Sequence, residues 1–411
     1  MNDPGRLTRD GWLLFAIRCL RMFGYGLLSV VLVLYLIEVG FRDWEIGLLL
    51  TLSLVGDTVI SLGLTTIADR LGRRRTLIVG AVLMALAGVA FVSTGNLFLL
   101  IVAATIGVIS PTGNEIGPFL SIEQASLTQV VSDERRTDVF AWYNLVGSFS
   151  TAFGALIGGL IAQASEHFGH SGAAAFRPVF LVYAVIGMSL TGGFALLSAA
   201  VETTKDALNT PPRGVLGLHE SRRTVFKLSL LFALDAFGGG FVIQSIIAYW
   251  FQVRYQLEPA MLGAIFLFSN LLAGVSALAA GWLARRIGLV NTMVFTHLPS
   301  NVLLILVPLM PDVYWAVGLL LLRFSISQMD VPTRQAYTMA VVRPDERSAA
   351  AGVTAVARSV GASISPLVAT IFVGSAGWMS VPFFLAGGLK IVYDLLLYRA
   401  FSGSQSRDEE K

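Results

Sequence analysis

The chain carries few charged residues for its length, and this shortage is the first constraint on its class. Only 13% of its 411 residues are Asp, Glu, Lys or Arg, whereas 55% are hydrophobic. Average soluble domains carry about 25% charged residues, because polar side chains must cover the core. This composition excludes a water-soluble globular protein and predicts that the long apolar runs lie in a membrane.

Cysteine and histidine are also scarce. Cys19 is the single cysteine, so the chain can form neither an internal disulfide nor a cysteine-based metal site. Three of the four histidines, at positions 167, 170 and 219, fall in predicted loops, which argues against a metal-dependent membrane enzyme. No Gly-x-x-x-x-Gly-Lys-Ser/Thr loop occurs, which excludes an ATP-driven pump. We expect no cofactor and no nucleic-acid partner; the net charge of +3 says little about partners, because the basic residues lie in particular loops.

Twelve apolar segments are each long enough to cross about 30 Å of hydrocarbon as a helix. They lie near residues 11–38, 44–68, 75–94, 97–124, 138–163, 177–201, 226–253, 259–284, 290–310, 313–336, 347–373 and 377–400. Irregular backbone cannot face lipid, so all twelve are expected to be helical. The first run lacks a small-x-small cleavage signal, and we predict a retained span instead of a signal peptide.

The most polar internal stretch divides these segments into two sets of six. It runs over residues 202–223 and contains two prolines, a glycine and several charges, as linkers do. We therefore predict an all-α integral membrane protein with twelve transmembrane helices in two pseudo-symmetric six-helix bundles. The predicted domains are an amino-terminal bundle at 1–201, a cytoplasmic linker at 202–225 and a carboxyl-terminal bundle at 226–411.

Lysine and arginine are distributed unevenly over the predicted connections, and this distribution predicts the orientation. With the amino terminus inside, the inner segments hold 20 of these residues and the outer segments hold three. The sequence therefore predicts a multi-pass protein of the inner membrane with both termini in the cytoplasm.

The two halves repeat short patterns at nearly constant spacing. Ala-Asp-Arg-Leu-Gly at 68–72 is echoed by Ala-Arg-Arg-Ile-Gly at 284–288, and Gln-Ala at 124–125 by Gln-Ala at 335–336. Internal repeats are typical of transporters in which the solute path runs between the two halves. The alternative is a duplication that yields only a stable bundle.

The connection between the second and third predicted helices carries a recognisable pattern. Residues 69–75 read Asp-Arg-Leu-Gly-Arg-Arg-Arg, with Thr65 four positions earlier. This loop resembles the signature Gly-x-x-x-Asp-Arg-x-Gly-Arg-Arg-Arg of the major facilitator superfamily, in which a glycine stands where Thr65 is. The resemblance implies a two-bundle transporter in which this loop braces one conformation, although its arginines could also only set topology. We assign the conformational gate here to Asp69, Arg70, Gly72 and Arg73.

The fifth predicted helix carries a second pattern. Residues 154–159 read Gly-Ala-Leu-Ile-Gly-Gly, which resembles the Gly-Pro-x-x-Gly-Gly motif of the superfamily's proton antiporters with Ala155 in place of proline. The resemblance slightly favours efflux. The alternative is that these glycines only allow neighbouring helices to pack closely.

Several ionisable residues fall inside the predicted spans. Each costs roughly 2.5–3.5 kcal/mol at the bilayer centre on insertion scales, so these residues must pair or face water. The superfamily resemblance implies a cavity lined by helices 1, 4, 7 and 10, and most of the set lies on those helices. We predict a substrate or proton site that comprises Arg18, Arg21, Asp57, Glu115, Asp235, Gln244, Arg323 and Arg358.

Glu115 and Asp235 are the first candidates for carrying a proton, with Asp57 the third. Prolines and glycines on both sides of Glu115 should bend or open its helix, and a carboxylate at low dielectric could load a proton near neutrality. Arg18 and Asp235 occupy matching places in the repeat, three residues after Phe15 and Phe232.

Some of these charges are also spaced for simple pairing. Arg21 and Asp57 lie at similar depth on helices joined by a hairpin, so a structural ion pair is the alternative to a transport role. Lys390 and Asp394 are four residues apart on a support helix and are expected to pair locally. His297 is expected to be structural.

The cytoplasmic half of the tenth helix offers a second part of the gate. Asp330 and Arg334 are four residues apart on one helical face, so they are expected to pair or to gate. Glu123 stands opposite Arg334 in the repeat, which suggests a bridge between the halves that breaks on opening. The predicted gate therefore also includes Glu123, Asp330 and Arg334.

Together these patterns predict a monomeric secondary transporter that moves a small organic solute across the bilayer by alternating access. Proton coupling is expected, with a slight preference for efflux of a drug or metabolite by antiport. The alternative is proton-symport import of an anionic or polar nutrient, for which the cavity arginines would be essential. A non-transporting receptor is a weaker alternative, and the repeat and loop argue against a channel.

Overall fold

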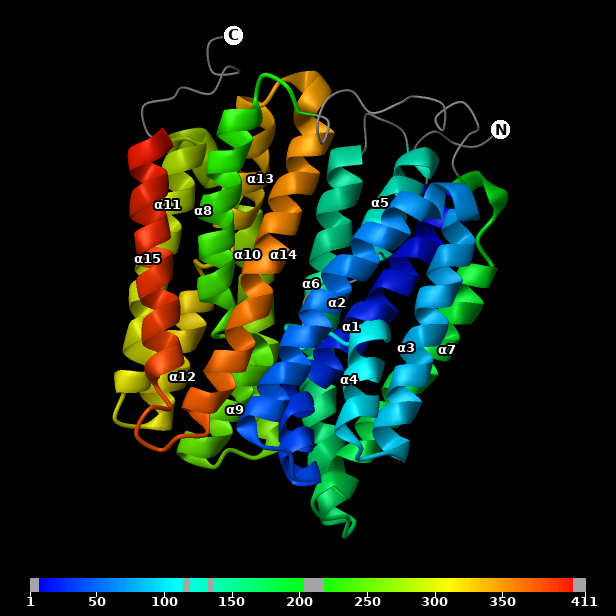
Figure 1. The fold of residues 1–411 in the computed structure, drawn as a ribbon, viewed down its shortest axis with the longest axis vertical. Coiled ribbons are helices and arrows are strands. Elements are labelled where there is room, and N and C mark those ends of the chain that lie inside the picture. Colours follow the sequence, from blue (N-terminus) through cyan, green and yellow to red (C-terminus); the bar gives the residue numbers. More distant parts are fainter. Residues whose placement is uncertain (1–6, 114–118, 132–135, 203–217, 402–411) are drawn as a thin grey trace. The chain divides into compact units, whose positions relative to one another are not determined.

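The computed structural model describes residues 7–113, 119–131, 136–202 and 218–401, and the regular elements of these ranges are helices (Figure 1). Ten helices in the described ranges are long and apolar enough to cross a membrane. The prediction of an all-helical membrane protein is therefore confirmed.

The chain forms two compact units. The first comprises Met1–Thr210 together with Gln256–Leu267. Its helices are α1 (Arg9–Val39), α2 (Asp43–Leu71), α3 (Arg73–Ser93), α4 (Leu97–Ile106), α5 (Phe119–Val130), α6 (Arg136–His167) and α7 (Ala173–Ala195).

The second unit comprises Pro211–Tyr255 and Phe268–Lys411. Helix α10 (Pro259–Ile287) begins in the first unit and continues in the second. The remaining helices are α8 (Arg222–Gly240), α9 (Gln244–Tyr255), α11 (Leu289–Leu306), α12 (Val313–Phe324), α13 (Asp330–Val341), α14 (Arg347–Val373) and α15 (Val381–Phe401).

Three segments expected as continuous helices are interrupted. The predicted fourth helix is divided into α4 and α5, the seventh into α8 and α9, and the tenth into α12 and α13. Glycines weaken a helix because they gain the most backbone freedom on unfolding, and α8 ends on the run 238–240. After α4, Val108 adopts a positive φ of 54°, which no helix tolerates. Periodicity alone did not reveal these breaks.

Helix α1 is buried along most of its length within the first unit. The Thr8 hydroxyl accepts a hydrogen bond from the Gly11 N–H at 3.1 Å and so caps its amino end. Gly40 ends it in the left-handed conformation, with φ 97°, and donates its N–H back to Ile37 and Leu36. Most side chains between these caps are buried, so α1 packs against its neighbours around most of its circumference.

Glycines set the distance between α1 and α6. A Cβ at Gly26 would collide with the carbonyl oxygen of Thr151, and one at Gly154 would collide with that of Phe23. A Cβ at Gly158 would meet the carbonyl oxygen of Leu27 in the same way. Close packing against α1 therefore accounts for two of the three glycines of the antiporter-like pattern on α6, and Gly159 packs in the same way against the carbonyl oxygen of Pro259.

Replacing Gly26 by alanine is expected to lower the free energy of unfolding by about 1–3 kcal/mol, because the two backbones must separate. Gly192 is the matched control, since a Cβ there would meet nothing within 4 Å. Alanine at Gly192 should be neutral or stabilise the helix by about 0.5–1 kcal/mol. Thermal unfolding in detergent measures both, and equal effects would contradict this account of the α1–α6 contact.

The second unit repeats this device between α8 and α14. A Cβ at Gly361 would collide with the carbonyl oxygen of Ala233, and one at Gly240 with that of Ala362.

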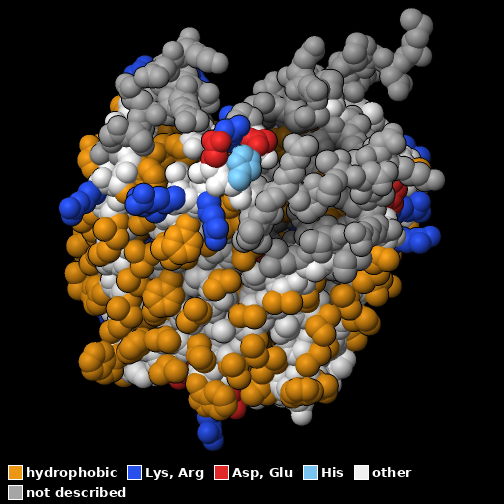
Figure 2. Space-filling view, turned by 45° about the horizontal axis from the view of Figure 1, so that its top comes forward, with side chains coloured by type: hydrophobic (Ala, Val, Ile, Leu, Met, Phe, Trp, Pro, Cys, Tyr) orange, Lys and Arg blue, Asp and Glu red, His pale blue; other side chains and the backbone are white. Residues whose placement is uncertain are grey.

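Large hydrophobic side chains remain exposed on many helices, and Figure 2 shows them across much of one face, with lysines and arginines nearer its margins. Such a surface suits contact with lipid, whereas a soluble monomer rarely exposes large apolar patches.

Candidate functional site

A buried carboxylate, Asp235 on α8, is the centre of a charged cluster in the second unit. Its side chain is only 5% exposed. The Lys390 ammonium of α15 lies 2.6 Å from its Oδ1, and Nη1 of Arg334 on α13 lies 2.9 Å from its Oδ2. Three helices far apart in sequence therefore meet at one carboxylate.

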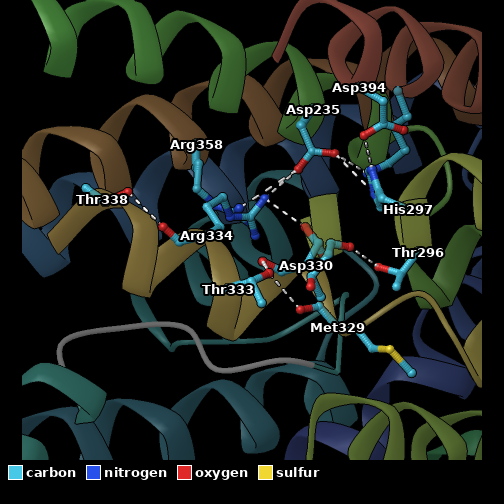
Figure 3. Close-up of polar contacts among 12 residues, drawn as sticks. Asp235, Thr296, His297, Met329, Asp330, Thr333, Arg334, Thr338, Arg358 and Asp394 are labelled. Atoms are coloured by element: carbon cyan, nitrogen blue, oxygen red, sulfur yellow. Dashed lines mark hydrogen bonds and ion pairs between the residues drawn. The ribbon is translucent and has the colours of Figure 1, made fainter. Parts of the chain in front are cut away.

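Arg334 joins a second carboxylate to this centre. Its Nη1 also lies 3.2 Å from Oδ2 of Asp330, one turn earlier on α13. Figure 3 shows the guanidinium of Arg334 between Asp235 and Asp330. The predicted pairing of Asp330 with Arg334 is confirmed, and charge-assisted hydrogen bonds of this kind are roughly twice as strong as neutral ones.

His297 of α11 lies between two carboxylates. Its Nδ1 is 2.8 Å from Oδ1 of Asp394, and its Nε2 is 3.7 Å from Oδ1 of Asp235 (Figure 3). The Asn301 amide donates to the other Asp394 oxygen at 2.9 Å. All four side chains are buried. The structure therefore places His297 in the charged cluster around Asp235. The sequence alone predicts only a structural role for this residue.

The expected local pair of Lys390 with Asp394 is not the arrangement found. Lys390 extends to Asp235 on α8, and Asp394 extends to His297 on α11. The two residues share α15, but each binds a different neighbouring helix. The two residues lie about one turn apart on α15, as the i,i+4 spacing predicts, but the predicted ion pair between Lys390 and Asp394 is wrong.

Two further arginines border the cluster. Arg358 of α14 places its Nη1 3.9 Å from Oδ2 of Asp235. Arg323, at the end of α12, is buried, and its guanidinium lies 4.9 Å from the centre of the Phe324 ring. Both arginines are within electrostatic reach of Asp235 and Asp330. The structure thus brings together three residues predicted for the transport site: Asp235, Arg323 and Arg358.

The first unit contains a separate buried ion pair. Nη2 of Arg21 on α1 lies 2.5 Å from Oε2 of Glu123 on α5, and neither side chain is exposed. The Tyr143 hydroxyl of α6 donates to the same oxygen at 2.5 Å. Arg18 donates from Nε to the Tyr143 carbonyl at 2.7 Å. The cations of α1 therefore connect α1 with α5 and α6.

This pair corrects the expected partner of Arg21. Asp57 of α2 instead accepts a hydrogen bond from Ser61, one turn further along its own helix. Among the described contacts, Glu123 pairs within the first unit and Arg334 within the second. The predicted bridge from Glu123 to Arg334 stays a prediction.

The two units carry their buried charges with opposite polarity. In the first, the cations lie on the first helix and the acid, Glu123, on the fourth predicted segment. In the second, the acid, Asp235, lies on the first helix and the cation, Arg334, on the segment that corresponds to the fourth. Because Arg18 matches Asp235 and Glu123 matches Arg334 in the repeat, each sign is inverted at a matching position.

The loop between α2 and α3 is hydrogen-bonded to Glu202, a residue after the last helix of the first unit. Glu202 accepts the backbone N–H of Arg73 at 2.7 Å and that of Arg74 at 3.2 Å. Gly72, which precedes α3, has φ 99°, a conformation that favours glycine. Gly72 and Arg73 of the predicted gate are thus placed by the backbone of this loop, while the side chains of Asp69 and Arg70 lie outside the described residues.

A matching contact holds the start of the second unit. The Glu346 carboxylate, buried between α13 and α14, accepts the backbone N–H groups of His219, Glu220 and Ser221. Burial alone would raise the pKa of Glu346, but the Ser221 side chain and these N–H groups outweigh burial and lower the pKa to about 2. The carboxylate therefore stays ionised and fixes the chain that leads into α8.

Replacing Glu346 by glutamine is expected to lower the Tm at neutral pH, because the amide is a weaker acceptor for three N–H donors. Because the folded-state pKa lies below the usual value of about 4.3, this contribution is complete above that value and is lost as the pH falls toward 2. The Tm difference between the wild type and the variant should shrink over that range. A difference independent of pH would contradict the assigned ionisation.

The remaining predicted site residues are placed as follows. Gln244, at the start of α9, is buried and accepts a hydrogen bond from Asn270 at 3.2 Å. Glu115 lies outside the described residues and stays a candidate from sequence alone. No group of three or more His, Cys, Asp or Glu side chains in the described ranges is arranged to hold a metal ion.

The Major Facilitator Superfamily profile matches residues 14–366 of the chain. The protein belongs to the Major Facilitator Superfamily. The resemblance inferred from residues 69–75 is therefore confirmed, and family and fold together identify a transporter and not an enzyme.

A yeast relative of this Major Facilitator Superfamily protein aligns over nearly its whole length. It is the uncharacterized membrane protein YJR124C of Saccharomyces cerevisiae, which is 29% identical over 97% of this chain and 96% of its own. The sequence similarity therefore extends over nearly the whole of both chains.

Solved transporters share the fold at low sequence identity. The nucleoside transporter NupG superposes with a TM-score of 0.73 over 97% of this chain and 100% of its own, at 14% identity. A D-xylose-proton symporter superposes with a TM-score of 0.74 over 95% and 97% of the two chains, at 12% identity. At such identities the likeness establishes the fold of this superfamily member and not its solute.

Proposed function

We propose that this protein is a proton-coupled secondary transporter that moves a small organic solute by alternating access. In this proposal the twelve predicted segments form two six-helix bundles, counting each interrupted pair of helices as one crossing. The protein acts as a monomer in the inner membrane with both termini in the cytoplasm, as the lysine and arginine distribution favours.

The observation that carries this proposal is the position of His297 between Asp394 and Asp235. Intramembrane ionisable groups are costly, and chains of Asp, Glu and His are typical of proton relays. A neutral imidazole has one ring nitrogen that carries a proton and one that can accept a proton. A buried histidine between two carboxylates is therefore a suitable place to load one proton.

The geometry indicates what that proton would do. In neutral His297 the Nδ1–H donates to Asp394, which leaves Nε2 without a proton on the side of Asp235. A proton bound at Nε2 creates a second donor that competes with Lys390 and Arg334 for the Asp235 carboxylate. Since Asp235 holds α8 to α13 and α15, protonation would change how strongly these helices are held together.

Direction is part of the proposal. The glycine pattern on α6 favours export in exchange for protons, although close packing of Gly154 and Gly158 against α1, and of Gly159 against Pro259, already accounts for those glycines. Proton-symport import of an anionic solute is the second candidate, and the arginines beside Asp235 favour it. Net transport against a defined pH gradient distinguishes these directions.

Replacing His297 by glutamine should abolish transport driven by a pH gradient while solute exchange continues, because glutamine keeps hydrogen bonding but carries no proton. A thermal-shift screen of the purified protein first supplies a solute. Uptake into proteoliposomes is then measured with and without a pH gradient. His167→Gln, an exposed histidine at the end of α6, is the matched control and should behave as the wild type.

The proposal fails if His297→Gln transports with an unchanged dependence on the pH gradient. The Tm and solute affinity of each variant are measured in parallel, because a variant that no longer folds would lose exchange as well. Loss of the gradient response with retained exchange supports a coupling role, since a purely structural histidine would affect both.

A further inference from the structure

A pocket of about 610 Å³ lies beside the first turns of α8 in the second unit. A volume of this size is typical of sites that hold a small organic group. Three of its apolar lining residues, Leu218, Val225 and Val353, belong to one small hydrophobic cluster. The fourth, Phe226, is exposed, so the apolar lining continues from the pocket to the outside of the helix.

The charged lining of this pocket has a positive surplus. Its acidic residue, Glu220, is already paired, because its Oε2 lies 2.6 Å from Nη1 of Arg343. Arg222 and Arg223 also line the pocket, and both are exposed. Neither side chain forms a hydrogen bond or an ion pair with any residue that the structure describes. Two guanidinium groups are therefore available to bind an anion at one cavity.

The two arginines stand at one end of a membrane span. The stretch Arg222–Tyr255 is long and apolar enough to cross a bilayer, so its first residues fall where lipid headgroups lie. Further along α8, Phe226 and Leu230 are 63% and 58% exposed, which suits contact with acyl chains. Figure 2 shows several Lys and Arg side chains along the upper border of a broad apolar surface. Basic side chains at such a border attract anionic lipids.

We propose that this pocket binds the headgroup of an anionic phospholipid. The lipid phosphate contacts Arg222 and Arg223, whose planar donor groups match phosphate oxygens, and an acyl chain lies along Phe226 and Leu230. A soluble phosphate compound offers the same oxygens but has no apolar part to cover the exposed phenyl ring. This inference is independent of the proposed transport function, because it uses no residue of the cluster around Asp235.

Lipid added to the purified, delipidated full-length protein tests this site by thermal unfolding in detergent. Dioleoylphosphatidylglycerol should raise the Tm by about 2 °C or more above the value with dioleoylphosphatidylcholine, which has the same chains but no net charge. Glycerol 3-phosphate supplies the phosphate without the chains and should cause a clearly smaller shift. Equal shifts with the two lipids would overturn the anionic site, and an equally large shift with glycerol 3-phosphate would overturn its assignment to a lipid.

Substitutions distinguish this pocket from a general attraction between basic residues and anionic lipids. Arg222→Gln/Arg223→Gln should lose most of the extra shift caused by phosphatidylglycerol. The matched control is Arg285→Gln/Arg286→Gln, which removes two adjacent exposed arginines at the end of α10 and should keep that shift. An equal loss in the control would show that the lipid responds to diffuse charge and would overturn the site.

Two further measurements complete the test. Because Arg222 and Arg223 are exposed, their removal should leave the Tm without lipid unchanged, and a clear fall would assign them to the fold and overturn the proposal. Phe226→Ser should reduce the shift caused by phosphatidylglycerol but not the one caused by glycerol 3-phosphate. An unchanged lipid shift in Phe226→Ser would overturn the placement of the acyl chain.

Discussion

Replacing Asp235 by asparagine is expected to lower the free energy of unfolding by about 3–5 kcal/mol, because it strands buried cations without their anion. Lys390 and Arg334 each lose a partner closer than 3 Å, and Arg358 loses its nearest carboxylate. Proton-driven transport should be lost as well, since His297 no longer faces a charge that responds to its protonation. Thermal unfolding and proteoliposome uptake measure the two effects.

A second substitution tests whether the lost stability comes from buried cations that no longer have an anionic partner. Lys390→Met removes one cation, so adding it to Asp235→Asn should recover part of the stability. Asp312→Asn is the matched control, because Asp312 caps α12 at the surface and asparagine caps helices equally well. A double variant no more stable than Asp235→Asn alone would show that Asp235 contributes by packing and not by charge.

Replacing either member of the Arg21–Glu123 pair alone is expected to cost about 3–5 kcal/mol of unfolding free energy. Neither side chain is exposed, so Glu123→Leu leaves a buried guanidinium and Arg21→Met leaves a buried carboxylate. The double variant should be more stable than either single variant, because two apolar side chains of similar size remove both charges. A double-mutant cycle of unfolding measurements gives the coupling between the two residues.

An exposed ion pair of similar length is the control for this experiment. Arg343 and Glu220 lie 2.6 Å apart, but their side chains are 41% and 66% exposed. Glu220→Gln should therefore lower the free energy of unfolding far less than either substitution in the buried pair, because water screens exposed charges. If the exposed and buried pairs had equal effects, burial would not be the origin of the cost at Arg21 and Glu123.

Sequence identified the apolar segments and most of the charged residues that form the cluster, because length, hydropathy and charge are local properties. It did not identify their partners. Arg21 and Asp57 lie on consecutive helices at similar depth, but α1 packs mainly on α6 and α7, and Arg21 meets α5 instead. Depth follows from counting residues, whereas the direction of a side chain depends on which helices surround it.

Lys390, Asp394 and His297 are three further residues whose interaction partners the sequence does not identify. Each is a polar residue inside a membrane span, and such residues are functional candidates by default. All three residues therefore qualify as functional candidates. The i,i+4 spacing of Lys390 and Asp394, however, favours a local pair, and no partner for His297 is evident from the sequence. Their convergence on Asp235 depends on α8, α11 and α15 lying together, and one sequence does not supply the order of helices in space.

The inverted polarity of the two buried ion pairs limits how the halves can be recombined. A chimera with the first helix of the amino-terminal half in place of α8 would put Arg18 where Asp235 stands, so one guanidinium would face another at Arg334. A tandem of two amino-terminal halves would avoid that clash but would lack Asp235 together with its neighbours His297 and Lys390. The opposite charges at these matching positions therefore predict that neither half can replace the other there.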